Sequence, residues 1–168
     1  MISIEAMAAR FAQVLYREAQ LLDEGRFESW LEMHSPDIEY VAHIQSDVVD
    51  EEAERNTSHR LSYLAENVQT LRLRVLKIRT GLQQTEIPAS RTVRLISNVR
   101  VQTTELAQTY DVHSAFLLYR NHRQRDVEIL AGHRADVWVE KDDRFLLLKR
   151  HIRFAANVLP TKSLSLFY

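Results

Sequence analysis

Apolar side chains recur every three or four residues through residues 4–22, which is the spacing of an amphipathic helix. Ser3 stands where its side chain can cap the first turn, and Gly25 follows the last apolar position, where helices commonly end. A short second helix is expected over residues 27–31, before Pro36 breaks the pattern. The pattern therefore predicts one long and one short helix ahead of the first strand.

The helical spacing returns in residues 61–78, where the apolar positions alternate steps of three and four. The Thr-Ser pair at 57–58 can cap this helix and Gly81 can end it, although the pattern allows a start as late as Val68. The preceding residues 47–54 are acidic and have almost no large apolar side chains. We therefore expect a solvated loop followed by a second long helix.

Elsewhere the apolar positions alternate with a period of two, which is the pattern of β-strands. The expected strands are residues 37–44, 93–101, 110–119, 127–139 and 145–156, with hairpin turns near 105–106, 121–125 and 141–144. The third strand is apolar on both sides, as expected for a central strand covered on both faces. In the fourth strand the odd-numbered positions share one face, and Gly132 stands where a bulge or bend would help the sheet to curl.

Helices followed by a run of hairpin strands define an α+β fold, with a curved antiparallel sheet wrapped around the N-terminal helices. Such a sheet forms a cone that encloses a pocket. We expect a single domain over residues 1–168, because 168 residues of which 45% are hydrophobic suffice for one core. Leu164, Leu166 and Phe167 are expected to be buried anchors of that core.

Cysteine is absent from the chain, which excludes disulfides, thiolate nucleophiles and iron–sulfur clusters, the Rieske type included. Residues 1–20 are interrupted by charged side chains and lack the apolar run of a signal peptide or membrane span. We therefore expect a cytoplasmic protein without membrane contact. A formal net charge of −1 and the absence of a recognition motif argue against nucleic acid as a partner.

Charge is distributed unevenly along the chain. Residues 1–56 carry 4 basic and 13 acidic side chains, a balance of −9, whereas residues 57–168 carry 18 basic and 10 acidic side chains, a balance of +8. Pairing across the fold is the simplest explanation, and contact with another charged protein surface is the alternative. Arg120, Arg123 and Arg125 lie in a basic turn, which is either a solvated hairpin tip or a docking tip for an acidic partner.

Two pairs of titratable residues are candidates for chemistry. Asp111 and His113 lie two positions apart on an expected strand and project to one side, where a carboxylate that orients an imidazole can build a general base. His133 and His151 lie on neighbouring expected strands and could join them in a non-haem iron site. The alternative for each is an ordinary surface or packing role, which is common for histidines and acid–base pairs.

Several sequence segments, spread in order over nearly the whole chain, together resemble those of a known family. They are residues 11–31, Arg79-Thr80-Gly81, residues 88–101, Phe116-Leu117-Leu118-Tyr119-Arg120-Asn121, residues 126–137 and the final 163–167. In this order they resemble the small (β) subunit of Rieske aromatic-ring-hydroxylating dioxygenases. The family often has Arg where this chain has His133, a departure that leaves the expected architecture unaffected.

The resemblance implies a cone-shaped, nuclear-transport-factor-2-like fold and a non-catalytic, structural subunit. It implies assembly with a large α subunit, usually as an α3β3 hexamer, in which the α subunit holds the Rieske [2Fe–2S] cluster and a mononuclear iron. The complex would dihydroxylate an aromatic ring in the catabolism of aromatic compounds. No cofactor or metal is expected in this chain itself, which agrees with its lack of cysteine.

Arginines are the natural candidates for the subunit interfaces, because a guanidinium group can make planar, bidentate contacts to acidic partners. The candidates are Arg91, Arg94, Arg120, Arg123 and Arg134. Two other hypotheses stay open: a stand-alone dehydratase or isomerase that uses Asp111 and His113 inside the cone, and a small-ligand binding module without chemistry.

Overall fold

The computed structural model of the protein describes residues 3–44, 62–82, 87–123, 126–156 and 166–168. Its elements are α1 (Ile4–Asp23), α2 (Phe27–Leu31), β1 (His34–Ile44), β2 (Ser62–Glu66), α4 (Val68–Arg79), β3 (Arg91–Thr103), β4 (Thr109–His122), β5 (Asp126–Lys141) and β6 (Arg144–Phe154). The Ser3 side chain accepts a hydrogen bond from the Ala6 N–H at 3.2 Å, and Gly25 has a φ of 69°. Both predicted boundaries of α1 are thus confirmed.

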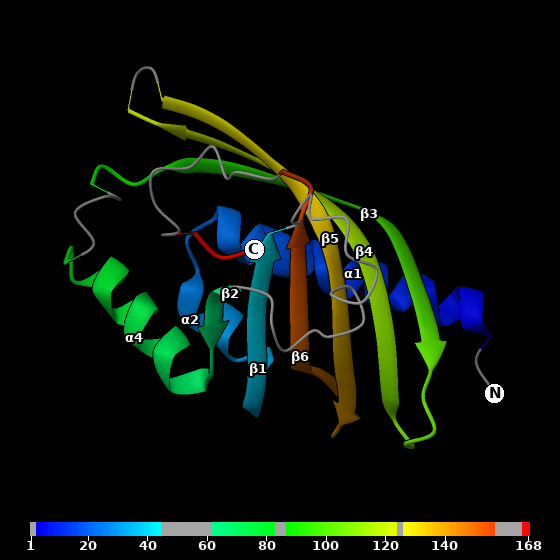
Figure 1. Cartoon of the computed structure of the whole chain (residues 1–168). Coiled ribbons are helices and arrows are strands. Elements are labelled where there is room, and N and C mark those ends of the chain that lie inside the picture. Colours follow the sequence, from blue (N-terminus) through cyan, green and yellow to red (C-terminus); the bar gives the residue numbers. More distant parts are fainter. Residues whose placement is uncertain (1–2, 45–61, 83–86, 124–125, 157–165) are drawn as a thin grey trace.

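All six strands form one sheet in the order β2-β1-β6-β5-β4-β3. Neighbouring strands are antiparallel except β1 and β6, which are parallel. Figure 1 shows the long strands curving together, with α1 lying along one face of the sheet and α2 and α4 at one end. The predicted α+β cone is confirmed. The parallel pair differs from the expected antiparallel sheet, because it joins strands too distant in sequence for a hairpin pattern to reveal.

The core lies between α1 and the side of the sheet that faces it, which we call the inner face. The ring of Phe11 on α1 lies 5.4 Å from that of Tyr110 on β4 and 4.5 Å from that of Phe145 on β6, centroid to centroid. Phe11, Leu15 and Trp138 are each fully buried. Because complete burial of such a side chain contributes about 1.5–3 kcal/mol, this contact anchors the cone.

Alternation along β4 and β5 separates the inner face from the opposite, outer face. Over residues 112–122 of β4 and 130–138 of β5, even-numbered residues are buried on the inner face, and odd-numbered ones project outward. The odd positions of β5 share a face as predicted, but it is the outer one, where Ile129 is 58% exposed. The prediction that the third strand is covered on both faces is wrong for the single chain, because Leu117 and Tyr119 on β4 are each 37% exposed.

Gly132 has a different role from the predicted one. The register shift between β5 and β6 lies between Val137 and Trp138, and Gly132 pairs regularly with Phe116 across β4. A Cβ atom at position 132 would lie 2.5 Å from the Arg153 carbonyl oxygen and 2.9 Å from the Phe116 ring. Glycine is therefore required here by the close approach of a neighbouring strand and ring. The predicted bulge at this position is wrong, whereas the alternative of a bend stays a prediction.

The second long helix is shorter than the widest predicted range. Helix α4 begins at Val68, and the Asn67 side chain accepts hydrogen bonds from the first-turn N–H groups while Thr70 completes a capping box. Leu64, predicted to lie on the helix, is in β2 and pairs with β1. The strong cap at Asn67 explains the difference, because it stops the helix from extending toward the predicted cap at 57–58, which lies outside the described residues.

The last described residues return to the core. Phe167 and Tyr168 are 1% and 0% exposed, and Leu166 is partly buried against the same core. The anchors predicted at Leu166 and Phe167 are thus confirmed. Leu164 and the predicted acidic loop 47–54 lie outside the described residues.

Candidate functional site

Four charged side chains meet at the centre of the cone: Glu18 on α1, Arg134 and Asp136 on β5, and Arg150 on β6. Each is at most 2% exposed. Arg150 Nη2 donates to Glu18 Oε2 at 2.9 Å and to Asp136 Oδ2 at 2.7 Å, and Arg134 Nη1 donates to Glu18 Oε2 at 3.4 Å. Trp30 Nε1 also donates to Glu18, at 3.1 Å. We call these four charged residues the buried charge cluster; two carboxylates balance two guanidinium groups within it.

Electrostatics keep Glu18, Arg134 and Arg150 of this cluster ionised at neutral pH. Burial alone raises the pKa of Glu18, but the positive charges of Arg150 and Arg134 outweigh it and lower that pKa to about 2. Burial also opposes the charge of Arg150, yet Asp136 and Glu18 hold its pKa well above the ordinary value. Burial and repulsion from Arg150 lower the pKa of Arg134 to about 10, still above neutral. None of these three groups is poised to exchange a proton near pH 7.

His34 lies beside the cluster and is also unsuited to acid–base work at neutral pH. Burial lowers the pKa of His34 to about 4, against the opposing attraction of Glu18. Its Nδ1 lies 2.9 Å from the Trp30 carbonyl oxygen. Because a carbonyl can only accept, Nδ1 carries the proton and the ring is held neutral in one tautomer.

Aromatic side chains fill the rest of the interior. The Tyr40 hydroxyl donates to the main-chain oxygen of Tyr168 at 2.5 Å and accepts from the Tyr168 N–H at 2.8 Å. The ring of Phe167 lies 4.4 Å from that of Trp30, and the ring of Tyr168 lies 5.0 Å from that of Phe154. All five aromatic side chains are at most 1% exposed. They occupy the space that an open cone would offer to a substrate.

Asp111 and His113 do not point into the cone. Both are odd-numbered residues of β4, so they share the outer face, as the spacing predicted, but on the side away from the core. Neither side chain forms a hydrogen bond or an ion pair with another residue that the structure describes. His133 and His151 also lie on this face, and His151 Nε2 is 3.4 Å from Glu39 Oε1. Within the described ranges, no three His, Asp or Glu residues are grouped so that they could hold a metal ion.

Three of the five candidate interface arginines are engaged within the chain. Arg134 belongs to the buried charge cluster. Arg120 is 5% exposed and pairs with Glu128 at 3.0 Å. Arg94 is 8% exposed, pairs with Asp23 and donates to the Phe167 carbonyl oxygen at 2.8 Å. These three guanidinium groups stabilise the fold.

The other two candidates are exposed. Arg91 begins β3 on the outer face, and Arg123 lies in the turn after β4, where its Nη2 donates to the Ile87 carbonyl oxygen at 3.4 Å. Both lie toward the same end of the sheet, since Arg91 pairs in register with Asn121. They are the candidate arginines whose side chains are available to a partner.

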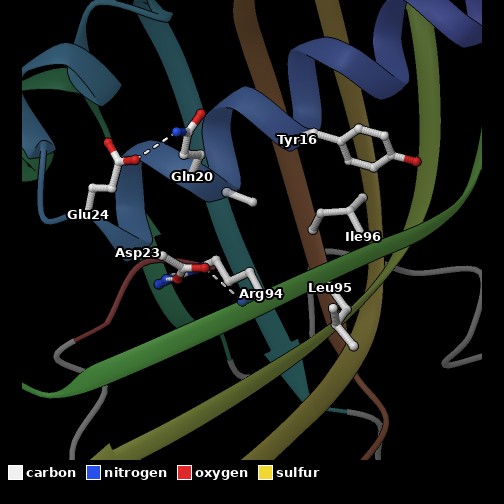
Figure 2. A pocket seen from close by; sticks show the side chains of 8 residues that line it. Tyr16, Gln20, Asp23, Glu24, Arg94, Leu95 and Ile96 are labelled. Atoms are coloured by element: carbon white, nitrogen blue, oxygen red, sulfur yellow. Dashed lines mark hydrogen bonds and ion pairs between the residues drawn. The ribbon is translucent and has the colours of Figure 1, made fainter.

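A groove of about 620 Å³ separates the end of α1 from β3. Figure 2 shows Arg94 reaching from β3 toward Asp23 on α1, with Gln20 and Glu24 joined by a hydrogen bond of 2.7 Å on the helix side. Tyr16 and Leu95 line the other part of the groove. Its polar groups bond mainly to one another, so the groove is the seam between helix and sheet.

Large apolar side chains gather on the outer face of three adjacent strands. They are Val93 and Leu95 on β3, Leu117 and Tyr119 on β4, and Val127 and Ile129 on β5, between 37% and 59% exposed. Val93 pairs in register with Tyr119, and Tyr119 with Ile129, so these side chains are neighbours. We call these six residues the apolar patch. Contiguous exposed apolar surface of this kind marks an interaction site.

Sequence reasoning missed the buried charge cluster, although a signal for it exists. The apolar spacing did not single out Glu18, yet it lies among the buried positions of α1. Arg134 and Asp136 share the inner face of β5 with Leu130 and Trp138. Charged residues that alternate with large apolar ones on one face of a strand are buried when that face is the inner one. Because buried charges are almost always paired, such a pattern indicates ion pairs in the core once the inner face is known.

Comparisons with solved structures define the class of fold. Naphthalene 1,2-dioxygenase with indole in its active site contains a chain that superposes with a TM-score of 0.86 at 23% identity, covering 99% of this chain and 88% of that chain. A scytalone dehydratase-like protein from Novosphingobium aromaticivorans DSM 12444 superposes with a TM-score of 0.62 at 15% identity, covering 87% and 82%. The protein therefore has the nuclear-transport-factor-2-like cone fold, which subunits and enzymes share.

Sequence similarity then separates these two classes. The family model described as ring hydroxylating beta subunit matches residues 17–161. The chain is 33% identical over 160 residues to the β subunit of biphenyl 2,3-dioxygenase from Rhodococcus jostii (strain RHA1), which covers 93% of this chain and 86% of that one. It is 31% identical over 160 residues to the β subunit of benzene 1,2-dioxygenase from Pseudomonas putida, with the same coverage. The chain belongs to the ring-hydroxylating β-subunit family.

Family membership confirms the resemblance read from the sequence. It makes the chain the β subunit of an oxidoreductase system, and it is consistent with a catalytic site located in the α subunit. It does not favour the hypothesis of a stand-alone dehydratase that would use Asp111 and His113. Among the helices that the structure describes, none has the length and hydrophobicity needed to cross a membrane. The expectation of a cytoplasmic protein stays a prediction.

Proposed function

We propose that the chain is the structural, non-catalytic small subunit of a multicomponent dioxygenase in the catabolism of aromatic compounds. It assembles with a large α subunit and stabilises it. That partner holds the Rieske [2Fe–2S] cluster and the mononuclear iron and dihydroxylates the aromatic ring. The β-subunit relatives are named for biphenyl and benzene dioxygenases, which supports an aromatic hydrocarbon or a related ring as the substrate of the complex.

The filled interior of the cone is the observation that carries the structural role. Glu18, Asp136 and Arg150 are committed to ion pairs with one another at the centre of the cone. The Tyr168 main chain closes the same space through Tyr40. The charged groups at the centre of the cone thus stabilise the fold, which suits a subunit whose contribution to the complex is its surface.

The stoichiometry that we propose is α3β3, with Arg91 and Arg123 in contact with acidic groups of the α subunit. Both residues are exposed. Both lie at the end of the sheet where β3 begins and β4 ends. Arginine at such a position can bind a carboxylate through two parallel hydrogen bonds. Arg94, Arg120 and Arg134 contribute indirectly, by holding β3, β4 and β5 in place.

Co-expression of the chain with its large partner tests the proposal. We expect the two chains to copurify in equal amounts, with iron and ring-dihydroxylating turnover in the complex only. The isolated chain should bind no iron and show no turnover when measured by metal analysis and product formation. Turnover by the isolated chain that is lost in the His113→Ala variant would contradict the proposal and support the enzyme hypothesis.

Charge reversal separates the two proposed contact arginines from the rest of the surface. The double variant Arg91→Glu/Arg123→Glu should lower the yield of complex at least tenfold in a pull-down through the α subunit. The matched control is Arg72→Glu/Lys77→Glu, which makes the same change in net charge at exposed positions of α4. Equal loss of complex in both variants would mean that net charge, rather than a local contact, governs assembly.

A further inference from the structure

Cationic side chains line a hollow on the outer face of the sheet. Arg100 on β3, His113 on β4, His133 on β5 and Arg153 on β6 line a cavity of about 500 Å³, together with Asn98 on β3. We call these five residues the basic groove. None of the described residues that line the cavity is acidic. The proposed function assigns these side chains no role.

A β-bulge in β3 brings Arg100 to the outer face. Ser97 pairs in register with Ala115, and both face outward. The next such pair is Arg100 with His113, so residues 98 and 99 of β3 lie opposite a single residue of β4. Asn98 accommodates the extra residue with a φ of 54°, a left-handed conformation that asparagine tolerates better than most residues. In a regular strand Arg100 would lie on the inner face, and bulges that redirect a side chain in this way are frequent beside functional sites.

Small side chains make the hollow. His113 pairs in register with Ala135 across β4 and β5. Ala115 pairs in the same way with His133, so two methyl groups alternate with two imidazoles on the central strands. The two arginines lie on either side, on β3 and β6, which are three strand spacings of about 4.8 Å apart. Both guanidinium groups can therefore reach a ligand that lies over the methyl groups between them.

The basic groove offers hydrogen-bond donors that the described part of the chain does not use. The side chains of its two arginines and two histidines form no hydrogen bond or ion pair with another residue that the structure describes. Asn98 Oδ1 accepts from Ser97 Oγ at 3.3 Å, which leaves the Nδ2 group of Asn98 to donate. Each imidazole has an N–H donor in either neutral tautomer. A ligand that fits these groups carries negative charge and several acceptor oxygens.

We propose that the basic groove binds a phosphate group, either as inorganic phosphate or as the phosphate of a small organic monoester. The planar fork of a guanidinium group matches phosphate oxygens through two parallel hydrogen bonds. A phosphate dianion balances the two guanidinium charges of Arg100 and Arg153, whereas one carboxylate balances a single charge. The site goes beyond the proposed function and does not depend on it, because one chain supplies every donor.

The apolar patch beside the groove distinguishes the two forms of the ligand. Leu117 follows Ala115 by two positions on the outer face of β4, and it pairs in register with Leu95 on β3. The organic body of a monoester would cover this exposed apolar surface, and removal of that surface from water would strengthen binding. Inorganic phosphate has no such body. A monoester with an aromatic ring should therefore bind more tightly than inorganic phosphate if the patch belongs to the site.

Isothermal titration calorimetry of the full purified chain tests the site. The ligands are inorganic phosphate and phenyl phosphate, at an ionic strength held constant with sodium chloride, and we expect saturable binding of one ligand per chain. Arg100→Gln/Arg153→Gln should weaken binding at least tenfold, because it removes both charged donors. Ala115→Leu should also weaken binding, since it fills the hollow without a change in charge. The control Arg72→Gln/Lys77→Gln makes the same change in net charge at exposed positions of α4 and should bind like the unaltered chain.

Two further measurements locate the bound phosphate. Asp111→Asn removes the carboxylate two positions before His113 on the same face, so this variant should bind at least as tightly as the unaltered chain. In NMR spectra, binding should shift the imidazole signals of His113 and His133.

Several results would overturn the site. They are the absence of saturable binding of both ligands, unchanged affinity in Arg100→Gln/Arg153→Gln, and binding that leaves both imidazole signals in place. An equal loss of affinity in Arg72→Gln/Lys77→Gln would also overturn it, because net charge alone would then govern binding. Tighter binding of phenyl phosphate supports a monoester as the ligand, and equal affinities support inorganic phosphate. Copurification with the α subunit is a separate measurement and still reports on the proposed function.

Discussion

Replacement of Glu18 by Gln should severely destabilise the fold, although it changes only a few atoms. Glu18 is 1% exposed and balances Arg150 and Arg134. The amide oxygen introduced by Glu18→Gln can still accept the Trp30 Nε1 hydrogen bond, so the main loss is the negative charge. Asp136 then remains as the one carboxylate of the cluster beside two buried guanidinium groups.

The size of this effect follows from the burial. Removal of one partner from a buried ion pair costs about 3–5 kcal/mol, because the remaining charge stays desolvated and unpaired. For a chain of this length, about 1 kcal/mol corresponds to a change of roughly 2–4 °C in the midpoint of thermal unfolding. We therefore expect the Glu18→Gln variant to unfold roughly 6–20 °C below the unaltered chain.

Urea unfolding at pH 7, followed by circular dichroism, measures the loss directly. The matched control is Glu28→Gln, because Glu28 is 59% exposed and pairs with Arg79 at 3.6 Å, so its loss should stay within about 1 kcal/mol. The double variant Glu18→Gln/Arg134→Gln should be less destabilised than the two single variants together. A loss below about 1 kcal/mol for Glu18→Gln would refute the reasoning, because a desolvated charge balance could not then exist.

Three further predictions concern acid, close packing and the returning end of the chain. Folding lowers the pKa of His34 from 6.5 to about 4 and that of Glu18 from 4.5 to about 2. As the pH falls, the unfolded chain therefore binds these protons at a higher pH than the folded chain does. Stability should thus fall as the pH drops below about 6.5, and His34→Gln should lose less between pH 7 and pH 5; an equal loss would contradict this. Gly132→Ala should cost about 1–3 kcal/mol in urea unfolding, while Ala131→Ser at the exposed neighbouring position should not. Phe167→Ala should cost about 3–5 kcal/mol and shift tryptophan fluorescence to longer wavelength, since its ring lies 4.4 Å from that of Trp30; unchanged fluorescence would count against this packing.

Local patterns were sufficient to predict most elements of the fold. The period of the apolar positions located α1 and the strands β3 to β6, and the caps at Ser3 and Gly25 fixed the limits of α1. The prediction failed for the residues just before α4, which were expected to be helical but form β2, because the spacing of their apolar residues also fits a strand. There Asn67 decides the outcome, because its side chain satisfies the first-turn N–H groups and ends the preceding strand.

The interior could not be predicted in the same way, because it depends on contacts between distant residues. Glu18 meets Arg150 across 132 positions, and Tyr40 meets Tyr168 across 128. No local pattern encodes such pairings, so Arg134 appeared as an interface candidate rather than as a partner of Glu18. The outer face shows the same limit, since a two-residue period does not indicate which side of the sheet α1 covers.

The meeting of Tyr40 with Tyr168 has a consequence for how a cell makes this protein. The interior cannot close while residues 167 and 168 are still inside the ribosome, because Phe167 packs on Trp30 and Tyr168 bonds to Tyr40. Closure of such long-range contacts is intrinsically late in folding. A nascent chain would thus expose Trp30 and Tyr40 until Tyr168 has emerged, and chaperones would have most to do before that point.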